Sequence, residues 1–495
     1  MNNLVFLPVG IAFLGFSLTL IVSRRSQKLA SLAVAVCYVG FGVWSMFNLS
    51  RDVTLRLNVG GWPSPFGISL MYDNLTALLI SLTGILYLAT VLYSKPGKTS
   101  EDSPLFFPLI HILICGISGA FTTGDLFNLY VWFEVILLSS FVLLSLGNKV
   151  ARIAGAFKYV VLNMLSSFFF LAAAGLVYNA AHTLNLVQLA SNLGELALVS
   201  PNYVLSLNIL LFIAFAIKSA LFPFFFWLPA SYHTLSPAIS ALFAGLLTKV
   251  GLYAIFRVNL FTFPQNDYVQ ALLGGLACAS ILIGVAGAIV QTSIRRILGF
   301  HIISQVGYIA LAGIFAFSSD STLQRFGISV ALFYMAHHIL VKANLYLVSG
   351  LVASITGTER LGKVTGLLAT HAFLALLFAI PALSLAGIPP FSGFWAKLGL
   401  FQAALSANQI LVIVVMLAGG FFTVFSMTKI WLSAFWGEAQ WDGNARPQRA
   451  PVCSVIACIL LSMLSVAIGL HPDLLFGRAE LAARDLISGI HHVAP

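Results

Sequence analysis

Six ionisable side chains lie inside long apolar stretches of this sequence. One is Glu134, the only one of the 15 acidic residues that we expect deep within an apolar run, and the others are Lys218, Lys249, Lys342, Lys397 and Lys429. Burial makes a lysine give up its proton more readily, whereas an arginine keeps its charge. Because the five embedded cations are all lysine, the sequence favours proton transfer over static charge.

The cost of burying these groups constrains how they are held. A charge at the middle of a bilayer costs about 2.5–3.5 kcal/mol on insertion scales, so six isolated charges would exceed the stability of a typical domain. We therefore expect paired, hydrated or neutralised groups. Glu134 is the natural partner of Lys218, and Lys249 and Lys397 are relay candidates. The alternatives are a static Glu134–Lys218 pair and lysines that reach the interface from helix ends.

Histidines extend this set. His338 lies four residues before Lys342, which places both on one helix face, and imidazole titrates near neutral pH. We therefore expect His338 to be a relay group. Secondary candidates are His337, Lys342, Lys429 and His301. For Lys429, a snorkelling lysine with no role in proton transfer is a nearly equal alternative. The remaining histidines are expected at interfaces, among them His111, His182, His233 and His371.

No metal site and no cofactor is expected. His337 and His338 are adjacent and cannot face one site on a helix. The five cysteines form no CxxC pair, and the sequence contains no haem, iron–sulfur or phosphate-loop motif. We interpret the cysteines as small core residues.

The composition defines the elements that must position these groups. Of the 495 residues 60% are hydrophobic and 8% charged, against about 25% charged in soluble proteins. This excludes an ordinary soluble enzyme, a disordered chain and a nucleic-acid binder. Fourteen apolar runs are each long enough for a helical span. They centre near residues 13, 40, 84, 113, 136, 168, 214, 249, 279, 306, 339, 385, 422 and 461. The fold class is an all-α polytopic membrane protein.

The net charge of +10 is explained by basic loops beside the membrane. With the N-terminus outside, 14 of the 25 Lys and Arg fall in cytoplasmic loops, six on the opposite side, Arg257 among them, and five inside spans. This asymmetry predicts both termini on the extracytoplasmic side of a plasma membrane. The first apolar run, residues 4–22, is interpreted as a retained span. Residues 474–490 could form an amphipathic interfacial helix or a disordered tail.

Two spans are expected to be broken. Residues 216–229 in the seventh span and 380–397 in the twelfth combine proline, aromatic residues and one lysine. Proline removes a backbone donor, and transporters built from repeated halves place interrupted helices at corresponding positions.

Several motifs together resemble one known family. They are Gly124-Asp-Leu-Phe-Asn-Leu-Tyr-Val-Trp-Phe-Glu134, Lys218 before Phe222-Pro223, Ser236-Pro-Ala-Ile-Ser-Ala-Leu before Lys249, His338 with Lys342, and Gly387-Ile-Pro-Pro-Phe-Ser-Gly-Phe before Lys397. Over nearly the whole chain they resemble the antiporter-like proteins, which are the proton-pumping membrane subunits of respiratory complex I and their relatives in Mrp cation/proton antiporters. The length resembles the D-type Mrp subunit.

The resemblance implies about fourteen transmembrane helices with two inverted five-helix repeats. It implies four parts: residues 1–103 (spans 1–3), 104–263 (spans 4–8), 264–436 (spans 9–13) and 437–495 (the last span and tail). By the same resemblance Glu134 and Lys218 form a controlling pair, Lys249 is the central relay, His338 bridges the repeats and Lys397 gates the exit.

The resemblance also implies partners. These are other membrane subunits of the Mrp A, B, C, E, F and G types, with H+ and Na+ as the transported ions. The chain is then a secondary transporter subunit, not an enzyme. A proton-pumping subunit of complex I or of a membrane-bound hydrogenase stays open as the alternative, because some of those relatives also have lysine at the broken twelfth helix.

Overall fold

The structure is a computed structural model that describes residues 2–49, 53–95, 100–147, 150–260, 262–438 and 451–491. In this part of the chain, twelve helices are long and apolar enough to cross a membrane. The expected span centres at 113 and 385 fall in shorter helices, and all fourteen centres lie within a helix. The chain is therefore a multi-pass helical protein, while the count of fourteen stays a prediction. Basic loop residues Arg51, Lys98, Lys149, Arg446 and Arg449 lie outside the described residues.

The helices at the expected spans are α1 (Leu7–Ile21), α2 (Arg24–Asn48), α3 (Asn74–Tyr93), α4 (Phe106–Thr122), α5 (Leu126–Ser145), α6 (Val150–Ala181), α8 (Pro201–Ser219) with α9 (Trp227–Ser231), α10 (Pro237–Ala254), α11 (Asp267–Val290), α12 (Ile294–Gly313), α13 (Ser321–Thr356), α15 (Ala372–Ala386) with α16 (Ser392–Ser406), α17 (Ile410–Ile430) and α18 (Val452–Leu470). A π-helical turn, η6 (Ile255–Leu260), continues α10. The other helices used below are α7 (Leu186–Val199) and α19 (Pro472–His491), and β1 (Leu55–Asn58) pairs antiparallel with β2 (Ser69–Tyr72).

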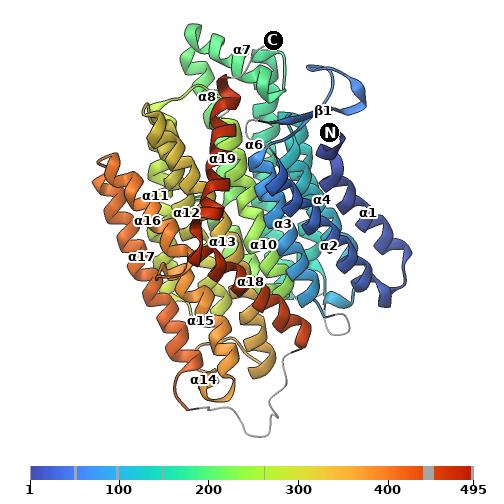
Figure 1. The fold of residues 1–495 in the computed structure, drawn as a ribbon, viewed down its shortest axis with the longest axis vertical. Helices are drawn as coiled ribbons and strands as arrows, with labels where there is room; N and C mark the ends of the chain where they lie inside the picture. The colour runs from blue at the N-terminus through green and yellow to red at the C-terminus, as the bar shows by residue number, and fades with distance from the viewer. Residues whose placement is uncertain are drawn as a thin grey trace.

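Helices α10, α12 and α13 form the centre of the bundle (Figure 1). The most apolar part of α10 with η6 is entirely buried, and that of α12 nearly so, whereas α11 and α17 expose most of theirs. Helix α13 packs against α10, α12, α15, α16, α18 and α19. Helices that are apolar on all sides belong in the core, and polar groups on α10, α12 and α13 are thereby kept away from lipid.

Both expected helix breaks are present. Helix α8 ends at Ser219, and Ala220 has φ +58°; α15 ends at Ala386, and Gly387 has φ +87°. A left-handed residue after the last turn is a common way to end a helix, and glycine adopts it without steric cost. Each break leaves carbonyl groups at the end of a half-helix inside the bundle.

Over the described residues 472–491, the C-terminal segment is a helix packed on the bundle and not a disordered tail. Helix α19 packs lengthwise against α13 and α3, and Asp485 accepts hydrogen bonds from the backbone N and the side chain of Asn74. The start of α1 and the end of α19 lie at the same end of the bundle as β1, β2 and α7 (Figure 1). We call this the hairpin end; Glu101, Ser236 and Glu359 lie at the opposite end.

Candidate functional site

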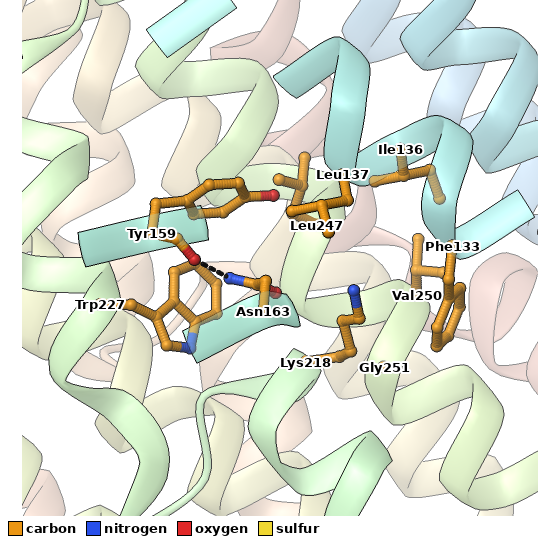
Figure 2. Close-up of a pocket in the computed structure, with 10 residues that line it drawn as sticks. All are labelled: Phe133, Ile136, Leu137, Tyr159, Asn163, Lys218, Trp227, Leu247, Val250 and Gly251. Atoms are coloured by element: carbon orange, nitrogen blue, oxygen red, sulfur yellow. Dashed lines mark hydrogen bonds between the residues drawn. The ribbon is translucent and has the colours of Figure 1, made fainter. Parts of the chain in front are cut away.

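Lys218 occupies the last turn of α8, just before the first break. Its Nζ lies 5.6 Å from the centre of the Phe133 ring and 3.5 Å from Ser167 Oγ. Figure 2 shows the amine pointing into a small cavity, beside which the Asn163 amide donates to the Tyr159 carbonyl. The cavity of about 20 Å³ holds about one water molecule. It is lined by Phe133, Ile136, Leu137, Tyr159, Asn163, Lys218, Trp227, Leu247, Val250 and Gly251.

Glu134 and Lys218 both lie in the described part of the chain, but no ion pair joins them there. Glu134 is half-buried on α5, and its Oε1 is buried without a hydrogen-bond partner among the described residues. Its carboxylate is near enough to act electrostatically on Lys218. The structure therefore places the two groups near each other without a direct ion pair. It does not show the static Glu134–Lys218 pair that was the alternative.

Lys249 lies in the most deeply buried span. Its side chain is fully buried on α10, and its Nζ donates to the Ala244 carbonyl at 2.6 Å. Gly251, two residues later, lets α10 approach the first break, because a Cβ there would lie 2.7 Å from the backbone N of Ser219. Lys249 thus aims its ammonium group toward the start of α10, and Gly251 on the same helix makes the contact with the first break.

A group of unsatisfied polar side chains continues from Lys249 between α10, α12 and α13. His338 and Lys342 are fully buried on α13, and within the described part of the chain neither ring nitrogen of His338 nor Nζ of Lys342 has a hydrogen-bond partner. His301 on α12 is buried in the same way. His338 is within electrostatic range of Lys249, Lys342 and His301. Buried polar atoms without partners mark positions for water.

Lys397 completes the second break. Its Nζ donates to the carbonyls of Leu385 at 3.2 Å and Ala386 at 2.7 Å, the last residues of α15, and lies 5.6 Å from the Tyr308 ring. The negative end of a half-helix stabilises a cation there. Lys397 is within electrostatic range of His301. A row of titratable groups therefore runs from Lys249 through His338 and His301 to Lys397.

His337 faces a different set of partners, as its angular offset from His338 predicts. Its Nδ1 lies 2.8 Å from Ser392 Oγ, and Ser392 is joined to Ser384 and Ser465 at 3.0 and 3.2 Å. His337 is therefore hydrogen-bonded where His338 is not, and it links α13 to the second break and α18.

One expectation is corrected, and one stays a prediction. Lys429 donates its Nζ to the carbonyls of Ile289 and Gln291 at the end of α11, and its role in proton transfer or as a snorkelling lysine stays a prediction. His111 is not interfacial: it is fully buried on α4 between Ser31 and Tyr87.

Sequence reasoning missed a buried ion pair at the hairpin end. Arg257, assigned to a loop, lies in η6 and pairs with Asp73 at 2.5 Å, with both side chains at most 2% exposed. Arg257 Nε also donates to Tyr253 Oη. The four-residue spacing of Lys249, Tyr253 and Arg257, which places them on one helix face, was the available signal.

Interrupted helices that carry buried lysines are typical of membrane subunits that translocate ions, and this is the class that the fold and the site indicate. Residues 123–423 match the family described as NADH:quinone oxidoreductase/Mrp antiporter, transmembrane. The chain belongs to this family.

Named relatives are similar over almost the whole chain. The D subunit of the Na+/H+ antiporter of Alkalihalophilus pseudofirmus is 40% identical over 88% of both chains. Among solved structures, a chain of the Mrp complex from Dietzia sp. superposes with a TM-score of 0.90 at 30% identity, covering 98% of this chain and 97% of that one. A chain of the membrane-bound sulfane sulfur reductase, an archaeal respiratory membrane complex, gives 0.88 at 25% identity and 99% of both.

Proposed function

We propose that this chain is the D-type, proton-translocating subunit of a multisubunit Mrp-type Na+/H+ antiporter in a prokaryotic plasma membrane. The observation that carries the proposal is the row Lys249, His338, His301 and Lys397, together with a lysine at each of the two helix breaks, Lys218 and Lys397. The likeness to the D subunit of a Na+/H+ antiporter and to an Mrp complex chain supports the same interpretation.

In the proposed route, the lysines are positioned by hydrogen bonds and not by ion pairs with carboxylates. Lys249 and Lys397 are stabilised by backbone carbonyls, which favour the ammonium form without fixing it as an ion pair does. A carboxylate that approaches a buried lysine favours its charged form, and withdrawal favours deprotonation. The gap between Glu134 and Lys218 is where we place this switch.

Sodium exchange is the outcome to measure. The complete complex is reconstituted in liposomes that enclose a pH-sensitive dye, and a Na+ gradient is applied. We expect Na+ to drive proton movement in the opposite direction, and Glu134→Ala and Lys218→Ala to reduce it in complexes that still assemble. Exchange at the native rate in both variants would favour a scaffold role for these charges.

A redox-coupled subunit is the second candidate, favoured by the similarity to the archaeal respiratory complex chain. Purification of the native complex separates the two. Partners that are small membrane subunits support the antiporter, whereas flavin and iron–sulfur proteins support the redox alternative.

A further inference from the structure

A carboxylate outside the membrane spans lies buried at the opposite end of the bundle. Glu101 is 8% exposed, and its Oε2 accepts a hydrogen bond from the Lys95 backbone N at 2.6 Å. Ser236, the N-cap residue of α10, lies beside the carboxylate. Burial raises the pKa of Glu101, against the hydrogen bonds and cations that lower it.

The surroundings of Glu101 come from several elements. The charged and titratable groups that face it or its neighbours are Lys28 on α2, Tyr93 on α3, Lys95 after α3, Arg152 on α6 and Arg295 on α12. Three of these cations bind other groups: Lys28 donates to the carbonyls of Leu92 and Ser94, Arg152 donates to those of Leu146 and Thr234, and Arg295 pairs with Glu359. Glu101 is therefore a buried carboxylate surrounded by basic side chains.

Lys249 points toward the end of α10 at which this carboxylate lies. Its Nζ bonds to the Ala244 carbonyl, five residues nearer the start of α10. From Ala244 to Ser236 is eight residues, or about 12 Å along the helix. Ser240 lies one turn before Ala244, so hydroxyl groups occupy the intervening helix face.

Buried hydroxyl groups without a hydrogen-bond partner among the described residues lie just before α10 and next to Lys249. Tyr232, just before α10, is fully buried, and its hydroxyl has no partner in the structure; the hydroxyl of Thr248, next to Lys249, is in the same state. Such groups are paired with water in most proteins. Together with the direction of Lys249 they indicate a hydrated approach along α10.

We propose that Glu101 is the proton-exchanging carboxylate at the opposite end of the Lys249 route, passing protons between solution and Lys249 past Ser236, Ser240 and Tyr232. The inference rests on the proposed function and adds the residue at which the route meets that aqueous side. A proton binds to a Glu101 carboxylate oxygen and is then released to water or to the next group. No other reactant is needed.

The test uses the complete complex in liposomes, with Na+-driven proton flux followed from pH 6 to pH 9. Glu101→Gln keeps an acceptor for the Lys95 N–H but cannot exchange a proton, and we expect at least about a tenfold loss of rate with a changed pH profile. Glu101→Asp should restore most of the rate. Glu438→Gln removes an exposed carboxylate at the same end, beside Thr365 and away from the start of α10, and should leave the pH profile unchanged.

Assembly decides which variant is informative. If Glu101→Gln does not assemble, Tyr232→Phe retains the ring contacts with Trp227 and Phe243 and removes only the hydroxyl; its rate should fall. A native rate and pH profile in the assembled Glu101→Gln complex, or in Tyr232→Phe when it must stand in, overturns the inference. Absence of Na+-driven flux in the native complex instead overturns the proposed function.

Discussion

Lys397→Arg separates proton transfer from helix capping at the second break. Lys397 donates to the carbonyls of Leu385 and Ala386 at the end of α15. Arginine can replace both the charge and these hydrogen bonds, but it does not release its proton at physiological pH. A relay role therefore predicts loss of exchange with retained assembly, and a structural role predicts that both persist.

The magnitude follows from the proton affinities of the two side chains. The reference pKa of arginine exceeds that of lysine by at least about 2 units, and each unit is about 1.36 kcal/mol. Deprotonation at position 397 then costs about 3 kcal/mol more, which slows a route through it about 100-fold. Lys397→Met, by contrast, removes two charge-assisted hydrogen bonds worth about 1.5–3 kcal/mol each and should destabilise the complex.

The assay is Na+-driven proton flux in liposomes, with subunit composition checked for each variant. Lys429→Arg is the matched control, because Lys429 makes the same kind of two-carbonyl contact at the end of α11 but lies outside the row. We expect Lys429→Arg to keep the native rate. Native exchange in an assembled Lys397→Arg complex would refute the relay role of this lysine.

Three further predictions follow from the packing and the hairpin end. Gly251→Ala should lower thermal stability and exchange, because its Cβ would lie 2.7 Å from Ser219 N; an unchanged melting temperature contradicts this. Asp73→Asn and Arg257→Met should each cost about 3–5 kcal/mol, and the double variant less than the sum, in denaturation of the purified complex. Burial and the nearby Asp73 raise the pKa of Asp485 to about 6. The stability this gives to α19 docking is therefore complete below about pH 4 and is lost as pH rises through 6. Hydrogen exchange should show that loss in the native chain and not in Asp485→Asn.

The sequence predicts the spans and breaks well because hydropathy and proline act locally. Apolar length defines a helix in lipid, and the residues after α8 and α15 carry their own break signals. The placement of Lys249, His338 and Lys397 inside the bundle was also predictable, since a titratable group in an apolar run has few alternatives, while their role in proton transfer stays a prediction.

Other features depend on contacts that no local pattern encodes. Arg257 follows an apolar run as a loop arginine would, and only the pairing with Asp73, 184 residues away, buries it. Lys429 and Lys397 look alike in sequence, and the helix end that each one meets distinguishes them. Residues 474–490 were ambiguous because their burial depends on α3 and α13.

Lys249 carries the central claim, because it lies in the most buried span and within electrostatic range of His338. The most direct measurement is Na+-driven proton flux of the reconstituted complex with Lys249→Met beside the native chain, at equal assembly. Our account predicts that the variant complex loses exchange. Flux at the native rate would contradict it.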